Sequence, residues 1–275
     1  MSIIEINDAY YTYGKDSESP TRAVCGVTLS VDEGEFVAVV GHNGSGKSTL
    51  ARLMNGLLVP EKGSVKVNGL ATSDDKNLFD VRKTVGVVFQ NPDNQMVATI
   101  IEDDVAFGPE NLGLPSEEIR ERVDWALKSV GMYEHRGGTP FRLSGGQKQR
   151  LAIAGVLAIK PRVMVLDEST SMLGPDGRAE VLDVVRRLNR EEKMSVVMIT
   201  HFMEEALLAD RIIVMDKGQI AMQGGKEIFE REDELTAMGL TVPVATRIAH
   251  ALKRRGVPIE GGVTTAEELI EKLCR

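Results

Sequence analysis

FVAVVGHNGSGKS occupies residues 36–48 of the 275-residue chain. Its first five residues are apolar without alternation, a pattern that predicts a strand buried on both faces of a parallel sheet. The remaining eight, Gly41 to Ser48, comprise a glycine, four variable residues and Gly-Lys-Ser, and a helical pattern follows from Thr49 to Leu58. In this context the glycines let backbone N–H groups turn inward around a polyphosphate, and the helix N-terminus favours negative charge. The alternative, an ordinary glycine-rich turn, rarely reproduces the full pattern between a strand and a helix.

This loop supplies most of the nucleotide-binding residues that we expect. Lys47 is predicted to reach the β- and γ-phosphates, and the Ser48 hydroxyl is predicted to bind Mg2+. The complete expected set in this segment is Gly41, His42, Asn43, Gly44, Ser45, Gly46, Lys47, Ser48 and Thr49.

A pair of carboxylates follows a second buried strand. The run 163–166 is apolar, and Asp167 and Glu168 come directly after it. Sheets of parallel strands bind ligands at the carboxyl ends of the strands. Because the chain turns where the strand ends, we expect Asp167 to bind Mg2+ and Glu168 to face the water that attacks the nucleotide. An Asp-Glu strand end is common by itself, so this interpretation depends on the phosphate-binding loop upstream.

Two further polar residues follow predicted strands. Gln90 opens a loop, where its amide is expected to touch both Mg2+ and the attacking water, and His201 is expected to hydrogen-bond a γ-phosphate. With Glu168 they form the predicted catalytic set, and Ser48, Gln90 and Asp167 form the predicted metal-binding set. Taken alone, a glutamine or histidine after a strand is usually an ordinary loop residue.

The sequence LSGGQ at residues 143–147 indicates a second anion site, because a helix that begins at a Ser-Gly-Gly turn presents backbone donors to a phosphate. The chain already has one phosphate loop, so a second anion site implies a second nucleotide. The motif resembles the signature sequence of ABC ATPases, in which it completes the ATP site of the other subunit in a head-to-tail dimer. The resemblance implies that ATP is bound by Ser144, Gly145, Gly146 and Gln147, and that Tyr13 stacks on the adenine.

This resemblance covers about residues 3–225 and also implies the fold. Strand patterns alternate with helical ones, as expected of an α/β protein with crossover connections. We therefore expect a P-loop NTPase fold of the ABC nucleotide-binding type, with an antiparallel β subdomain. Residues 1–225 would form the ATPase domain, with a helical insert at about 92–158. Residues 226–275 would form a small C-terminal helical extension that contributes to dimerisation.

Composition indicates in which cellular compartment the protein is found and which partners and sites are not expected. The chain is 42% hydrophobic and 27% charged, which fits a soluble globular protein, and no apolar stretch approaches the roughly 20 residues that span a bilayer. The N-terminus lacks the pattern of a signal peptide, so we expect a cytoplasmic protein. The two cysteines, Cys25 and Cys274, predict neither a disulfide framework nor a zinc site. A net charge of −8 without a basic block argues against a nucleic-acid partner.

Three segments resemble the ATPase subunits of energy-coupling-factor transporters, which import vitamins and metal ions such as cobalt and nickel. They are 90–95 (QNPDNQ), 102–108 (EDDVAFG) and 166–173 (LDESTSML). The resemblance implies ATP hydrolysis that drives a membrane importer at the cytoplasmic face of the membrane. It also implies three partners: a second ATPase subunit, identical or not, a transmembrane coupling subunit, which the segment after Gln90 would contact, and a substrate-binding membrane subunit. For residues 91–95 a simple polar turn is the alternative.

One position departs from the family pattern. Gly174 stands where the family usually has an aspartate that reaches toward the partner's phosphate loop, so communication between the two ATP sites is expected to be looser. This leaves open a mainly regulatory, weakly hydrolysing subunit. An ATPase of a different ABC importer, which shares every catalytic motif, and a non-transport ABC protein stay open as well. Non-transport members usually carry paired cassettes or long coiled coils, and this sequence has neither.

Overall fold

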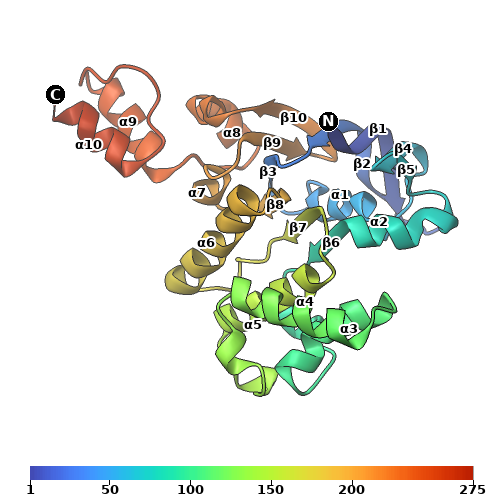
Figure 1. The fold of residues 1–275 in the computed structure, drawn as a ribbon. Coiled ribbons are helices and arrows are strands. Elements are labelled where there is room, and N and C mark those ends of the chain that lie inside the picture. The colour runs from blue at the N-terminus through green and yellow to red at the C-terminus, as the bar shows by residue number, and fades with distance from the viewer. Residues whose placement is uncertain (275) are drawn as a thin grey trace.

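The computed structural model describes residues 1–274, which fold around two sheets (Figure 1). The larger sheet has six strands in the order β10-β9-β3-β8-β7-β6, and its strands are parallel except for β10, which is antiparallel to β9. Their bounds are β3 Phe36–Val40, β6 Val85–Val88, β7 Val163–Asp167, β8 Ser195–Thr200, β9 Arg211–Asp216 and β10 Gln219–Gly224. The strands β3, β6, β7 and β8 are buried along their whole length, which explains why their sequences are apolar without alternation.

The smaller sheet is antiparallel, with the order β2-β1-β4-β5. Its strands are β1 Ser2–Tyr13, β2 Thr21–Asp32, β4 Lys62–Val67 and β5 Leu70–Ala71. Apolar residues of β1 and β2, among them Ile4, Ile6 and Leu29, are buried in a core shared with α1 and one face of the larger sheet. The expected α/β class with an antiparallel β subdomain is therefore confirmed.

Helices cover the larger sheet and extend beyond it. Between β6 and β7 the chain forms three long helices that lie together below the sheet in Figure 1. After β10 the described residues form three α-helices, and the last two lie apart from the rest at the opposite side of the molecule from the small sheet. The α-helices are α1 Lys47–Met54, α2 Leu78–Thr84, α3 Ile101–Asn111, α4 Ser116–Ser129, α5 Gly145–Ala158, α6 Pro175–Glu191, α7 Met203–Ala206, α8 Glu232–Ala237, α9 Val244–Arg254 and α10 Ala266–Leu273. Short 3-10 helices are η1 Asp75–Asn77, η2 Pro92–Asn94, η3 Tyr133–His135, η4 Pro140–Arg142 and η5 Lys226–Glu230.

Three hydrophobic cores correspond to this arrangement. One joins the other face of the large sheet to α3–α6, a second lies between the two sheets, and a small third core holds α9 and α10 together through Ala249, Ile259 and Leu269. Among residues 1–274, no helix has the length and apolar composition that crossing a bilayer would need.

Candidate nucleotide-binding site

Most of the predicted site residues follow the carboxyl ends of four neighbouring parallel strands. The phosphate loop leaves β3, Asp167 ends β7, His201 follows β8 and Gln90 lies two residues beyond β6. Parallel strands bring their carboxyl ends to one edge of a sheet, so residues far apart in the sequence meet there.

The shape of the phosphate loop depends on its glycines. Gly44 and Gly46 have φ of 82° and 102°, in the left-handed region that other residues rarely adopt. The loop also approaches neighbouring backbone closely: a Cβ at Gly46 would lie 2.2 Å from the Ala23 carbonyl oxygen, and one at Gly41 would lie 2.5 Å from that of Met215. The sequence pattern of the loop is thus required by its packing as well as by its ligand.

Lys47 is the first residue of α1, and it is almost completely buried, with 4% of its surface exposed. Its Nζ donates hydrogen bonds to the carbonyl oxygens of Gly41, at 2.8 Å, and of His42, at 3.0 Å. Burial lowers the pKa of Lys47, and the Glu168 carboxylate, whose Oε1 lies 3.6 Å from Nζ, opposes that shift. A buried ammonium held by carbonyls and one carboxylate is suited to bind an anion.

Two carboxylates face this lysine from the end of β7. Asp167 is buried, and its Oδ1 accepts a hydrogen bond of 2.8 Å from the Ser48 hydroxyl. Burial raises the pKa of Asp167, the Ser48 hydrogen bond opposes the shift, and the neighbouring charge of Glu168 adds to it. A hydroxyl and a carboxylate side by side supply the hard oxygen ligands that Mg2+ takes.

Glu168 has an unusual backbone conformation, with φ of 49°. A non-glycine residue adopts this region at a cost, and such residues cluster at functional sites. The conformation is held by a hydrogen bond of 3.0 Å from its N–H to the carbonyl of Ile199 in β8. Its Oε2 lies 3.7 Å from Nδ1 of His201, so Lys47, Glu168 and His201 form one group at the edge of the sheet.

Two other predicted residues border this group. The Gln90 amide donates a hydrogen bond of 3.2 Å to the Ser171 hydroxyl, which follows the carboxylate pair. The Tyr13 hydroxyl accepts hydrogen bonds from Thr49, at 3.3 Å, and from Arg52, at 3.2 Å, both in α1. Gln90 and Tyr13 are therefore anchored to the elements that carry the phosphate loop and the carboxylates.

The second predicted anion site has a well-formed helix start. Ser144 caps α5: its hydroxyl accepts from the Gln147 N–H, and the Gln147 side chain accepts from the Ser144 N–H in return. Ser144 and Gly145 are exposed, and Gly146 packs against Gly177 in the first turn of α6. In the part of the chain that the structure describes, no hydrogen bond or ion pair joins residues 144–147 to the phosphate loop. The structure therefore groups the other predicted residues but leaves this turn apart.

Sequence reasoning missed several residues that contact the predicted set, among them Ser171 and Asp216. Ser171 bonds Gln90, and Asp216 bonds His42 with 2.9 Å between Oδ1 and Nε2. Asp216 ends β9, so the signal that identified Asp167, a carboxylate at the carboxyl end of a buried strand, also marks this position.

The sequence of this chain is similar to those of known proteins, both in a family model and in individual relatives. The family model described as "ABC transporter" matches residues 24–171. A protein of Symbiobacterium thermophilum named energy-coupling factor transporter ATP-binding protein EcfA1 is 56% identical over 270 residues, covering 96% of this chain and 94% of its own length. The protein of the same name from Caldanaerobacter subterraneus is 50% identical over 274 residues, covering 99% of each.

Two solved structures are similar to most of this fold. One is cbiO1 of Clostridium perfringens, described as part of the ABC transporter complex cbiONQ, with a TM-score of 0.78 and 34% identity over 92% of this chain and 99% of that one. The other is an ATP-binding cassette described as a dimer in a post-hydrolysis state bound to ADP and Pi, with a TM-score of 0.73 and 30% identity over 81% of this chain and 98% of that one.

Proposed function

This chain belongs to the ABC transporter family and is the ATP-binding, ATP-hydrolysing subunit of an energy-coupling-factor importer; from that premise we propose how it uses ATP and what it assembles with. Its ATP lies between the phosphate loop of one ATPase subunit and the 144–147 turn of a second. The observation that carries this proposal is the isolation of that turn. It is a capped, exposed helix start with a glycine pair, and among the described residues no hydrogen bond or ion pair links it to the phosphate loop of its own chain.

The residues at the sheet edge fit an Mg2+ ion. Ser48 and Asp167 already place two oxygens together, and Gln90 in the adjacent loop would add an amide oxygen. We assign the ion to these three residues, where it would neutralise charge on the β- and γ-phosphates. Burial of Asp167 disfavours its charged form, and a cation beside it would relieve that cost.

The remaining site residues promote ATP hydrolysis by positioning the reacting groups and stabilising their charge. Lys47 exchanges its contacts with loop carbonyls for phosphate oxygens, Glu168 orients and polarises the attacking water, and His201 donates to the γ-phosphate. Tyr13 stacks on the adenine. No covalent intermediate is required, because phosphoryl transfer to water depends on alignment and electrostatic stabilisation.

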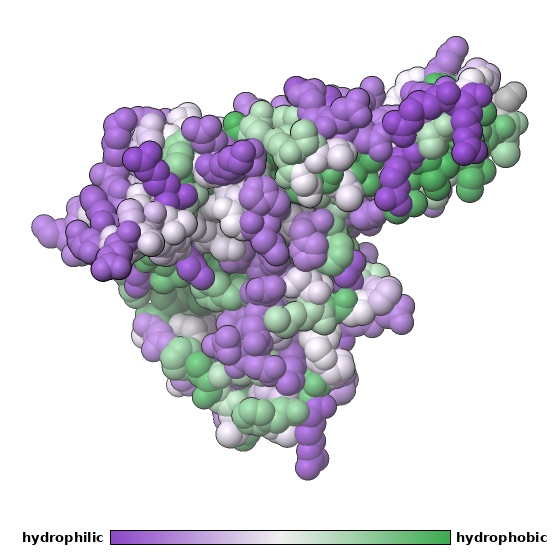
Figure 2. All heavy atoms as spheres, turned by 180° about the vertical axis from the view of Figure 1, so that it is seen from behind, coloured by the Kyte–Doolittle hydropathy of each residue, from purple (hydrophilic) through white to green (hydrophobic). Residues whose placement is uncertain are grey.

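We assign residues 1–225 to the ATPase domain, with 92–158 as its helical insert, and residues 226–275 to a C-terminal extension that strengthens the dimer. The extension exposes large apolar side chains on α9 and α10: Val244, Ile248, Ile270 and Leu273. In Figure 2 the lobe at the upper right carries a green, hydrophobic surface. Exposed apolar patches of this kind mark interaction sites.

The segment after Gln90 is the surface that we assign to the transmembrane coupling subunit. Asp104 is buried and accepts hydrogen bonds from the N–H groups of Val97, at 2.6 Å, and Ala98, at 2.9 Å, which fixes the loop before α3. Val97, Ile100 and Phe107 remain exposed around it. A rigid loop with exposed apolar side chains close to Gln90 could bind the coupling subunit and transmit movements of the ATP site to its membrane helices. The chain would then lie at the cytoplasmic face of the membrane, and its partner subunits would select a vitamin or a transition-metal ion such as cobalt.

The experiment is affinity purification of the tagged chain from gently solubilised membranes, with mass spectrometry of the proteins that accompany it. We expect a second ATPase, one transmembrane coupling subunit and small membrane proteins that bind substrate. A variant with Ile248→Asp and Ile270→Asp should lose the second ATPase, whereas Phe79→Asp, which changes an equally exposed side chain in α2, should retain it. A conventional pair of permeases with a soluble binding protein would contradict the assembly proposed here.

A further inference from the structure

The turn between β9 and β10 lies against the phosphate loop. Lys217 and Gly218 both have positive φ, 48° and 79°, as the two central residues of a tight type I′ hairpin turn do. The Gly218 N–H donates to the carbonyl oxygen of Ser45 at 3.0 Å, and its own carbonyl accepts from the Cys25 N–H at 2.8 Å. A Cβ on Gly218 would lie 2.9 Å from the Ala23 carbonyl oxygen. The turn is thus wedged between the loop and β2.

A second contact joins the same hairpin to the loop. Nε2 of His42 lies 2.9 Å from Oδ1 of Asp216, and Nδ1 lies 2.7 Å from the carbonyl oxygen of Asn43. The ring therefore bridges the loop backbone to the end of β9, and a ring nitrogen that carries a proton donates to the oxygen it faces. The side chains are 35% and 23% exposed, so the contact is partly shielded from water.

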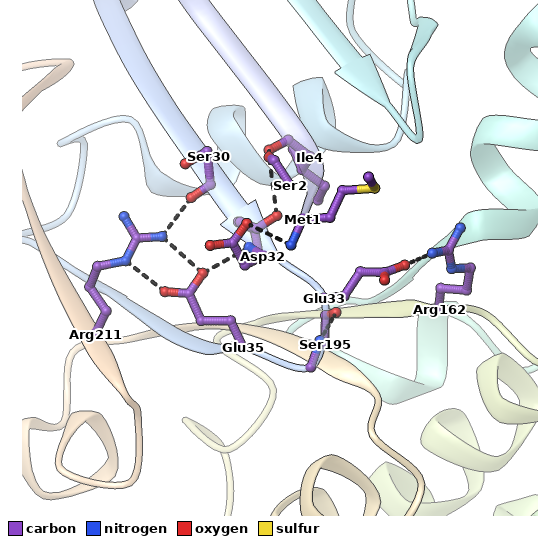
Figure 3. A network of polar contacts seen from close by, with 12 residues as sticks. Met1, Ser2, Ile4, Ser30, Asp32, Glu33, Glu35, Arg162, Ser195 and Arg211 are labelled. Carbon is purple, nitrogen blue, oxygen red and sulfur yellow. Dashed lines mark hydrogen bonds and ion pairs between the residues drawn. The ribbon is translucent and has the colours of Figure 1, made fainter.

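The position of Asp216 is set independently of the loop. β9 pairs with β3 from Arg211 to Val214. Its first residue, Arg211, binds both carboxylate oxygens of Glu35, at 2.7 and 3.0 Å, and the carbonyl of Ser30, at 2.6 Å (Figure 3). One end of the strand is therefore clamped to the chain before β3, and the other end presents Asp216 to the chain after β3. The sheet supplies a fixed point against which the loop is held.

We infer that Asp216 is a positioning residue for the phosphate loop: through His42, and together with the Gly218 N–H, it holds residues 42–45 in the form that receives the phosphates. The inference rests on the ATP site described above. A loop ordered before its ligand arrives loses less conformational entropy on binding, so the contact contributes to affinity although Asp216 touches no phosphate.

Removing the acceptor tests this role. In a Glu168→Gln background, which limits hydrolysis, Asp216→Ala should raise the Kd for ATP with Mg2+ by about three- to tenfold, since a charge-assisted hydrogen bond contributes that much or more. Asp216→Asn keeps an oxygen acceptor for the ring and should bind within about twofold of the parent. His42→Ala should match Asp216→Ala, and the double variant should be no weaker than either single one.

If Asp216 acted through its charge alone, its removal would change ATP affinity in the opposite direction, and that result would overturn the inference. A carboxylate near a triphosphate also repels it, so if charge alone mattered, Asp216→Ala and Asp216→Asn would both tighten binding. Tighter binding by both variants, equal weakening by both, or additive effects of His42→Ala and Asp216→Ala would each contradict a positioning role. If Asp216→Ala does not fold, His42→Ala and Asp216→Asn still distinguish these outcomes.

Two control variants distinguish loss of the positioning contact from a general loss of stability and from the absence of an ATP site. Arg211→Gln removes the contact with Glu35 but leaves the pairing of β9 with β3, which fixes the end of the strand at Asp216, so it should lower Tm and leave the Kd for ATP unchanged. Lys47→Ala should lose ATP binding; unchanged affinity in that variant would refute the ATP site itself, whatever Asp216 does.

Discussion

The packing of the phosphate loop predicts different responses to the same substitution at two of its glycines. Gly44 and Gly46 both have positive φ, but a Cβ at Gly44 meets nothing within 4 Å, whereas one at Gly46 lies 2.2 Å from the Ala23 carbonyl oxygen. Alanine costs about 1–2 kcal/mol of left-handed strain at either site. It also restricts the unfolded chain, which returns about 0.4–1 kcal/mol.

Gly44→Ala should therefore destabilise the protein by roughly 1 kcal/mol. Gly46→Ala carries an additional clash with backbone that no side-chain rotation relieves, and overpacking of this kind costs about 1–3 kcal/mol more. The expected total is about 2–4 kcal/mol. For a chain of this size each kcal/mol lowers Tm by roughly 2–4 °C, so Gly46→Ala should melt several degrees below Gly44→Ala.

Thermal unfolding of the nucleotide-free variants, followed by circular dichroism at one protein concentration, measures the difference. Because both glycines belong to the same loop and have similar backbone conformations, Gly44→Ala controls for strain. Equal melting temperatures for the two variants would refute the argument that contact with β2, and not φ alone, requires glycine at position 46.

Three other substitutions have distinct expected outcomes. Glu168→Gln should bind ATP normally and lose hydrolysis by about a hundredfold or more in a phosphate-release assay; retention of most turnover would exclude Glu168 as the residue that activates water. Asp167→Asn should raise Tm at neutral pH. Burial raises the pKa of Asp167, so the stability it contributes is present below the unfolded value of 3.8 and is lost as pH rises through the higher folded value. The gain should vanish in acid, and a variant less stable than the parent at pH 7 would contradict this reasoning. Gly174→Asp places a carboxylate at the uncapped start of α6, where φ is −65° and a Cβ meets nothing within 4 Å, so stability should rise by roughly a few tenths of a kcal/mol. Unchanged ATP turnover in that variant's assembled dimer would mean that Gly174 does not weaken communication between the ATP sites.

Local sequence patterns predicted much of the fold and most of the candidate site. Strands buried on both faces have continuous apolar sequences, so β3, β7 and β8 were recognisable, and the polar residues that follow them had to meet at one edge of a parallel sheet. The helix start at Ser144 was likewise predicted from a local Ser-Gly-Gly pattern, and the structure adds a capping box between residues three apart in the chain. These features are local or follow from the general geometry of parallel sheets.

Contacts between distant segments could not be predicted in this way. Nothing near Asp216 in the sequence indicates that its carboxylate bonds His42, and nothing near Gly46 indicates that the Ala23 carbonyl lies against it. The sequence by itself determined which chemical groups the chain carries and at which strand ends they stand, because those depend on local periodicity and motif spacing. Only the tertiary structure decided how deeply Lys47 and Asp167 are buried and what holds the phosphate loop, because burial and close backbone approach arise when strands that are far apart in the chain pack side by side.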